Sequence, residues 1–171
     1  MEISRFHELL GLPSVNGDVE YDWRDLETRS GVALPADYKQ FVTAYGPGCL
    51  NEQLYLFHPR AASDGLRLEE LWRQASYAYS ELARSAPDMY PYPIYPEVGG
   101  LIPVARSMSG NHVLLSLPKA GDRGWSVVLE MGQWIPLNMP FTDFLWQSLT
   151  GELGVPLIEG EPLFEPVGAI E

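Results

Sequence analysis

Three histidines and one cysteine are the side chains in this sequence best suited to acid–base, nucleophilic or metal-binding chemistry. His7 falls in a predicted helix, His58 at the end of a predicted strand and His112 in a predicted turn. No two of them stand at a spacing that would bring both to one metal ion. Cys49 follows a glycine in a predicted turn and has no histidine beside it. We therefore predict structural or solvated roles for all four, and no metal site.

Two short motifs resemble catalytic or phosphate-binding sequences only in part. Gly46-Pro47-Gly48 lacks the Lys-Ser/Thr continuation of a phosphate loop, and its proline removes a backbone donor that such a loop would use. The segment 107–110 reads Ser-Met-Ser-Gly, but a predicted hairpin is the wrong setting for a nucleophile, which needs a strand-to-helix turn. We predict no catalytic residue, no cofactor and no enzymatic activity. An enzyme of another kind stays open, and a deep pocket lined by groups with shifted pKa values would indicate one.

The charge of the chain restricts its partners. Eleven basic and 23 acidic residues give a net charge of −12, which repels phosphate backbones and attracts cationic partners. Nucleic acid is therefore not expected as a ligand, and a basic protein is. The same charge would also arise in a protein that only needs to stay soluble.

The sequence predicts a protein of the cytoplasm that does not enter membranes. No basic segment followed by an apolar run marks a signal peptide at the N-terminus, and the longest apolar stretches fall far short of the ~20 residues that span a bilayer. A single cysteine, Cys49, cannot form an internal disulfide and suits a reducing compartment.

A tyrosine- and proline-rich segment is the best candidate for contact with a partner. Residues 90–96 read Tyr-Pro-Tyr-Pro-Ile-Tyr-Pro, and the three prolines exclude a helix and favour an extended loop. Tyrosine is common at interfaces because it offers a large contact area for little ordering cost. The predicted contact residues are Tyr90, Tyr92 and Tyr95, with Asp88 and Glu97 as an acidic rim. Alternatively, the three rings only cover the sheet.

The elements that must position these residues begin with helices. Apolar residues at helical spacing predict helices over residues 4–10, 21–29, 35–45, 64–85 and 142–151, with Ser4, Asp64 and Thr142 as N-caps. The segment 35–45 is the clearest, because a proline opens it and Gly46 suits a left-handed cap.

The second half of the chain reads as strands separated by short turns. Residues 53–57, 101–106, 112–117, 125–131 and 133–137 are rich in aliphatic and aromatic residues, with turns at 47–51, 109–111 and 120–122. Helices first, then hairpin-linked strands, then one helix, predict an α+β fold with an antiparallel sheet of about five or six strands. Helices of the N-terminal half and one closing C-terminal helix would pack on this sheet.

Three blocks of this sequence follow one another in a distinctive order. The first contains Trp23, Glu27, Gly31, Leu34, Pro35, Asp37, Tyr38, Phe41 and the run Tyr45-Gly46-Pro47-Gly48. The second is the segment 101–106 followed by Gly110-Asn111 and then the segment 125–134, and the third is the segment 141–151. This order resembles the SUKH superfamily, which includes a yeast cell-wall-synthesis regulator.

The resemblance implies one SUKH-like domain over residues 1–151, with an inserted helix and loop at about 64–96 and a C-terminal extension over 152–171. It also implies a scaffold without catalytic residues, whose bacterial members are often immunity proteins that neutralise toxins, typically nucleases or deaminases. An acidic inhibitor can occupy the basic substrate cleft of such a toxin. A regulatory adaptor that binds cellular partners is the alternative. The sequence does not predict the oligomeric state or the identity of the toxin.

Overall fold

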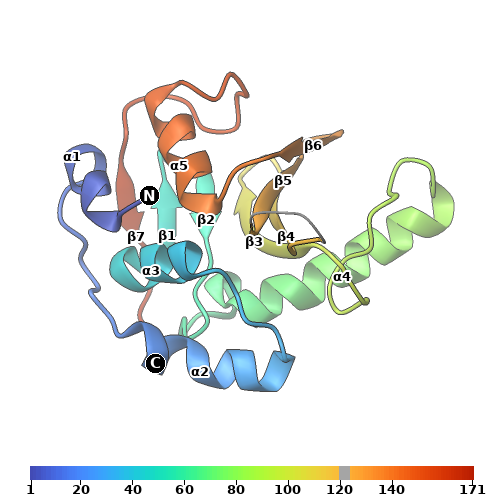
Figure 1. Ribbon diagram of the computed structural model, residues 1–171, viewed down its shortest axis with the longest axis horizontal. Coiled ribbons are helices and arrows are strands. Elements are labelled where there is room, and N and C mark those ends of the chain that lie inside the picture. The colour runs from blue at the N-terminus through green and yellow to red at the C-terminus, as the bar shows by residue number, and fades with distance from the viewer. Residues whose placement is uncertain (120–123) are drawn as a thin grey trace.

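The structure is a computed structural model that describes residues 1–119 and 124–171. It confirms the α+β prediction: helices and one antiparallel sheet are segregated along the chain (Figure 1). The helical elements are η1 (Ile3–Phe6), α1 (His7–Leu10), α2 (Val19–Ser30), α3 (Ala36–Tyr45), η2 (Asp64–Leu66), α4 (Leu68–Ser85) and α5 (Phe141–Thr150).

Seven strands form the sheet in the described part of the chain, slightly more than the five or six predicted. They are β1 (Gly48–Leu50), β2 (Leu54–Leu56), β3 (Ile102–Ser107), β4 (His112–Ser116), β5 (Ser126–Glu130), β6 (Trp134–Leu137) and β7 (Phe164–Pro166). Their spatial order is β6-β5-β4-β3-β2-β1-β7, and every neighbouring pair is antiparallel. The predicted meander is confirmed. Its predicted turn at 120–122 lies outside the described residues.

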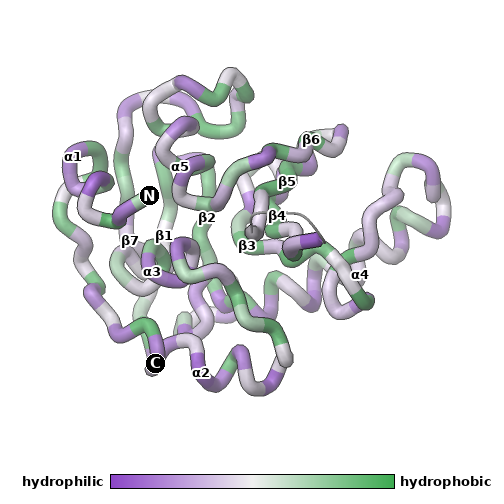
Figure 2. The backbone as a smooth tube through the Cα atoms, in the orientation of Figure 1, coloured by the Kyte–Doolittle hydropathy of each residue, from purple (hydrophilic) through white to green (hydrophobic). Residues whose placement is uncertain are grey.

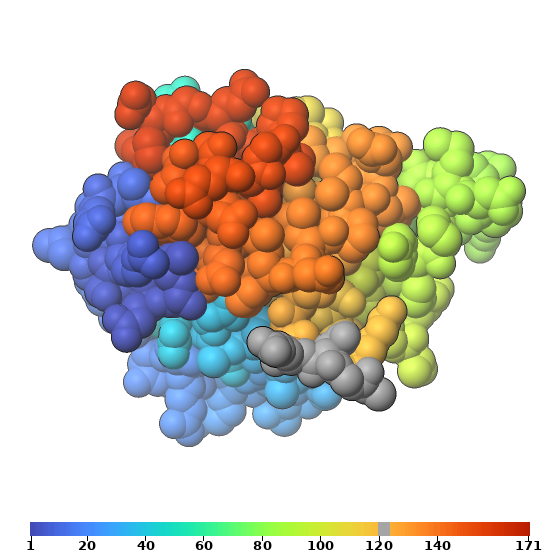
Figure 3. All heavy atoms as spheres, turned by 45° about the horizontal axis from the view of Figure 1, so that its top comes forward, coloured from blue at the N-terminus to red at the C-terminus, as the bar shows by residue number. Residues whose placement is uncertain are grey.

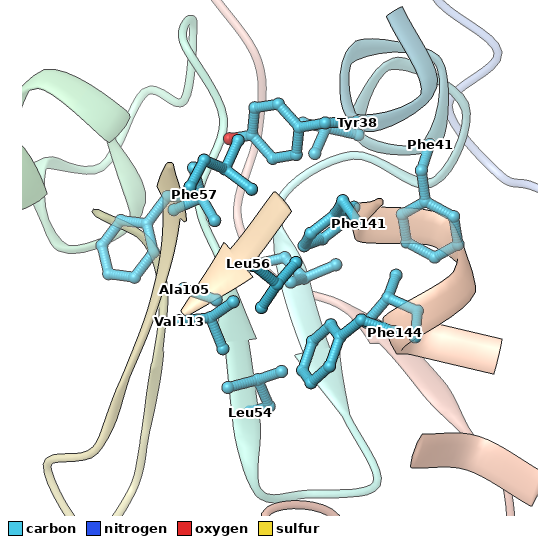
Figure 4. Packing of buried hydrophobic residues seen from close by; sticks show 14 of the residues in the cluster. Tyr38, Phe41, Leu54, Leu56, Phe57, Ala105, Val113, Phe141 and Phe144 are labelled. Atoms are coloured by element: carbon cyan, nitrogen blue, oxygen red, sulfur yellow. The ribbon is translucent and has the colours of Figure 1, made fainter. Parts of the chain in front are cut away.

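Strand alternation divides the buried side chains between the two faces of the sheet. On one face, Tyr38 and Phe41 of α3 pack with Phe141 and Phe144 of α5 against strand residues such as Leu56 (Figure 4). These side chains belong to the main core. Figure 2 shows the hydrophobic stretches of the chain gathered along the strands and the helices that pack on them.

A second, smaller cluster covers the other face. Ala75 and Tyr79 of α4 meet Leu114 of β4 and Val128 of β5, and Ile94 of the proline-rich segment joins them. Both faces of the sheet are therefore covered, one of them by the long helix and the loop that follows it.

The block around α2 and α3 is held by specific polar contacts. Trp23 is buried, and its Nε1 donates a hydrogen bond to Thr43 Oγ1 at 2.8 Å. Glu27 accepts from the backbone N of Leu34 at 2.7 Å and from Lys39 Nζ at 2.9 Å, which fixes the connection between the two helices. These contacts join the first two long helices, α2 and α3.

Several predicted helix ends were wrong. Glu2, and not Ser4, precedes the first helical residues, which are a 3-10 turn. The segment after Asp64 is also a 3-10 turn, capped by Ser63, and α4 begins only at Leu68. Thr142 is not an N-cap, because α5 begins one residue earlier and the Thr142 hydroxyl donates to Asp37 Oδ2 instead.

The glycine that ends α3 also differs from the prediction. Gly46 has φ 81° and ψ −169°, which is a positive-φ conformation outside the left-handed helical region. A β-carbon at this position would lie 2.4 Å from Val15 Cγ2. The position therefore requires glycine for two reasons, its dihedral angle and its close neighbour.

Cys49 lies in a strand and not in a turn. Gly48–Leu50 forms β1, which pairs with β2 on one side and with β7 on the other. A β-carbon on Gly48 would meet the carbonyl oxygen of Glu165 at 2.5 Å, so the strands β1 and β7 approach closely. The predicted C-terminal extension thus supplies an edge strand of the main sheet.

Candidate partner-binding surface

The Tyr–Pro loop (residues 90–96) lies against the sheet face that α4 also covers. The rings of Tyr90 and Tyr92 stand 6.3 Å and 5.1 Å from the ring of Trp134, and the ring of Tyr95 stands 4.9 Å from that of Trp72. All three tyrosines are half-buried. Tyr90 and Tyr92 therefore pack on Trp134 of β6, and Tyr95 packs on Trp72 of α4, while a role in partner contact stays a prediction.

The backbone of this loop is tied to the start of β3. Tyr95 N donates to the carbonyl oxygen of Leu101 at 2.9 Å, and Leu101 N donates to that of Pro93 at 2.8 Å. Trp134 Nε1 donates to the carbonyl oxygen of Met89 at 2.9 Å and fixes the entry to the loop. The loop is therefore held by buried anchors despite its lack of regular structure.

The two acidic residues at the ends of the loop face solvent. Asp88 and Glu97 are exposed, and so are the apolar side chains of Met89 and Val98, at 62% and 100%. Each end of the loop thus exposes one carboxylate and one apolar side chain, and the tyrosine rings expose only part of their faces.

A hydrogen-bonded cluster lies behind the loop. Tyr79 Oη is 2.9 Å from His112 Nδ1 and 3.2 Å from Glu130 Oε2, so α4 is linked to the paired strands β4 and β5. Burial raises the pKa of Tyr79, and burial followed by the charge of Arg106 lowers the pKa of His112 to about 4. The tyrosine hydroxyl donates to Glu130, and His112 Nδ1 lies within hydrogen-bond distance of the same hydroxyl oxygen, so the cluster joins packed elements. His112 is the first residue of β4 and does not lie in a turn.

A second polar cluster is enclosed between α2 and the segment after β2. Asp22 Oδ1 accepts from Arg60 Nη1 at 2.9 Å, and Asp22 Oδ2 lies 3.6 Å from His58 Nε2, too far for a hydrogen bond. His58 Nδ1 accepts from the backbone N of Arg60 at 3.0 Å, so its proton is on Nε2.

His58 is fully buried and Asp22 nearly so, which prevents a substrate from reaching them. Burial lowers the pKa of His58 to about 4 against the opposing effect of the Asp22 charge. Asp22 Oδ2, His58 Nε2 and the nearby Tyr38 Oη have no hydrogen-bond partner among the described residues. This cluster has the residue types of an acid–base site, but its side chains are buried like those of the core.

The other side chains that could act as nucleophiles, Ser107 and Cys49, lie in positions where they support the fold. Ser107 Oγ accepts from the backbone N of Asn111 at 3.0 Å, and Gly110 has φ 88°, so the 107–110 segment is a hairpin turn as predicted. Cys49 is buried, and burial together with the charges of Glu165 and Glu52 raises the pKa of its thiol. A protonated thiol is a poor nucleophile.

The C-terminal segment forms an acidic surface that the sequence reasoning did not identify. From Gly124 onward the chain contains seven acidic residues and no lysine or arginine: Glu130, Asp143, Glu152, Glu159, Glu161, Glu165 and Glu171. The five glutamates after Gly151 are all exposed. The absence of lysine and arginine from this stretch was the signal in the sequence that could have revealed the acidic surface.

The acidic segment is fixed to the β1–β2 turn. Asn51 accepts from Leu163 N at 2.8 Å, and its Nδ2 donates to the carbonyl oxygen of Glu159 at 3.2 Å. Gln53 Oε1 accepts from Glu159 N at 2.8 Å, and Leu157 is buried in the main core. Figure 3 shows the C-terminal chain lying across the body of the molecule. The carboxylates are therefore presented from an anchored backbone.

Within residues 1–119 and 124–171, no group of three or more His, Cys, Asp or Glu side chains could hold a metal ion. The helices of the same residues are all too short or too polar to span a bilayer.

Comparison with known proteins gives one clear relationship. Neither a curated protein nor a solved structure matches the chain significantly. The family model described as SMI1 / KNR4 family (SUKH-1) matches residues 20–147, which run from the start of α2 into α5 and make up most of the chain. The match includes Trp23, Glu27 and the α3 block described above. The chain therefore belongs to the SMI1 / KNR4 family (SUKH-1).

Proposed function

We propose that this chain is a non-catalytic, cytoplasmic immunity protein that binds a cognate toxin domain and blocks it. The SUKH family is generally non-catalytic, and its known roles lie in immunity and regulation. The observation that carries the proposal is the anchored acidic segment, whose exposed glutamates have no basic residue between them in the sequence, although Glu171 at its end pairs with Arg67. A nuclease or deaminase carries a basic cleft for its nucleic acid, and fixed carboxylates can occupy that cleft in place of phosphates.

Fast electrostatic association suits an immunity protein, because it must bind the toxin before the toxin acts on its substrate. A net charge of −12 accelerates encounter with a basic partner, and an anchored backbone reduces the ordering cost of binding. The Tyr–Pro loop offers a second contact region, in which Asp88 and Glu97 would form the rim and Met89 and Val98 the apolar centre. The partner-contact role of Tyr90, Tyr92 and Tyr95 belongs to the same proposal.

Charge reversal at matched positions separates these regions. Glu159→Lys with Glu161→Lys, and Asp88→Lys with Glu97→Lys, each change the net charge by +4, from −12 to −8. The pair Glu2→Lys and Glu8→Lys at the N-terminus makes the same change at positions that belong to neither region, although Glu2 lines a hollow together with Glu152. Differences between the three variants therefore report position and not total charge.

The assay is calorimetric titration of each variant with the protein encoded beside this chain, at low and high salt. We expect one-to-one binding that weakens with salt, at least a tenfold loss for the variant at a contact region, and little change for the N-terminal pair. Equal small losses for all three variants would contradict a localised acidic contact. Weak binding to several unrelated cellular proteins would favour the adaptor alternative.

A further inference from the structure

The outer face of α4 lines a groove that contains charges of both signs and an exposed tyrosine. The groove has a volume of about 630 Å³ and lies between α4, the C-terminal end of α2 and the Tyr–Pro loop. Its α4 residues recur every three or four positions and form one continuous stripe: Glu69, Trp72, Arg73, Ser76, Tyr77, Ser80, Glu81 and Arg84. The end of α4 projects from the body of the molecule (Figure 1), so a second molecule can reach this stripe.

The stripe combines a protruding ring with two small side chains. Tyr77 is 69% exposed, although tyrosine is large and aromatic. Ser76 and Ser80 lie one helical turn apart beside it and leave room for a side chain from outside. Trp72 is buried at the base of the groove, where its Nε1 donates to the carbonyl oxygen of Pro103. The surface therefore offers a protruding side chain, Tyr77, and a space beside Ser76 and Ser80 that could receive one.

The charges of the stripe alternate in a self-complementary order. Reading from the N-terminus, they are Glu69, Arg73, Glu81 and Arg84. If two copies of α4 lie antiparallel about a midpoint near Ser76, Glu69 of one faces Arg84 of the other. Arg73 then faces Glu81, and every charge meets its opposite. In a parallel arrangement, every charge would meet its like.

The local charge balance also favours a second copy over other occupants. The groove contains three arginines and two glutamates, including Arg29 and its ion-pair partner Glu69, whereas the chain has a net charge of −12. The net negative charge makes two copies repel each other over most of their surface, whereas the groove has no excess of negative charge. Glu69, Arg73 and Glu81 already pair with Arg29, Glu70 and Arg84 within the chain, so the stripe is close to neutral and does not select a strongly basic or a strongly acidic partner.

We propose that α4 pairs antiparallel with α4 of a second copy of this chain, and that Tyr77 of each copy inserts beside Ser76 and Ser80 of the other. The 18 residues of α4 extend over about 27 Å, which limits the contact to a single helix pair and its flanks. Such an interface lies at the small end of specific interfaces. The dimer is therefore weak, and it forms in the micromolar concentration range.

Two measurements test this pairing. The first is sedimentation equilibrium of the full chain from about 5 μM to 1 mM, which should show a reversible monomer–dimer equilibrium. Arg73→Glu should weaken the dimer at least tenfold, because it places a second carboxylate opposite Glu81 of the other copy at both symmetry-related contacts. Arg73→Glu combined with Glu81→Arg should restore it. Circular dichroism checks that each variant keeps its helix content.

The second measurement is disulfide trapping. Ser76→Cys lies near the two-fold midpoint and should give a covalent dimer under mild oxidation, whereas Arg24→Cys, at an exposed position on α2, should not. A chain that remains monomeric at 1 mM would overturn the proposal. So would a dimer that is insensitive to Arg73→Glu, or one that is trapped equally well from Arg24→Cys.

Discussion

Mild acid should destabilise the fold through the buried His58 and the half-buried His112. His58 and His112 each have a pKa of about 4 in the folded protein, below the ordinary value of 6.5. Between these two values the unfolded chain binds a proton at each site and the folded chain does not. The stability that the two neutral imidazoles contribute is therefore fully present above about pH 6.5 and is lost as the pH falls towards 4.

The magnitude follows from the number of protons taken up on unfolding. One proton changes the free energy of unfolding by about 1.4 kcal/mol per pH unit, so two give a slope of about 2.7 kcal/mol per pH unit in the middle of this window. Urea denaturation at pH 4.8, 5.3 and 5.8 measures the slope directly.

Two histidine variants complete the design. His112→Asn keeps an amide group near the place of Nδ1 that can hydrogen-bond to Tyr79 Oη, loses the titrating group and should roughly halve the slope. His7→Asn on α1 leaves both His58 and His112 in place and should retain the full slope. A stability that is flat between pH 4.8 and 5.8, or an unchanged slope in His112→Asn, would refute this reasoning.

Three further substitutions test contacts that hold the fold, each read from the midpoint of chemical denaturation. Gly46→Ala should cost about 2 kcal/mol or more, since a β-carbon there conflicts with a φ of 81° and with Val15; a neutral result would mean that this turn is not rigid. Asp37→Ala should cost about 1 to 2 kcal/mol because it removes the acceptor for Thr142 N and Oγ1, and Asp37→Asn should cost less. Phe164→Ala should cost about 3 kcal/mol and increase hydrogen exchange in β1, whereas unchanged exchange would show that β7 does not protect that strand.

The helix α3 could be predicted because its signals are local. Pro35 fixes the entry, Tyr38 and Phe41 mark the buried face, and Gly46 ends it, all within one short segment. The predicted and observed bounds agree to within one residue. Hairpin strands β3 to β6 were found for the same reason, since each pairs with its neighbour in the sequence.

Elements that depend on distant partners could not be predicted. β7 has three residues, ends in proline, and within the described residues pairs only with Gly48–Leu50, which lies more than 110 residues earlier; β1 is equally short and begins with a glycine, although it also pairs with its sequence neighbour β2. Thr142 has the side chain of a good N-cap, yet its hydroxyl donates to Asp37, which is 105 residues distant. A local pattern contains no information about such partners.

The candidate surface was predictable only in part. The prolines of residues 90–96 indicated a loop without a helix, which the structure has, but the chain turns at 94–97, and the side that the tyrosines face is decided by Trp72 and Trp134 from separate elements. The acidic C-terminal segment was present in the sequence as a run without basic residues. Its anchoring by Asn51 and Gln53 required the three-dimensional structure.

The central claim is that this chain acts by binding and blocking another protein and performs no chemistry itself. Its most direct test is the survival of cells that express the gene adjacent to this one, with and without this chain. We predict that the adjacent protein alone stops growth, that co-expression restores it, and that the Glu159→Lys/Glu161→Lys or the Asp88→Lys/Glu97→Lys variant protects less well than the Glu2→Lys/Glu8→Lys variant. Growth that does not depend on this chain, or full protection by all three variants, would contradict the account.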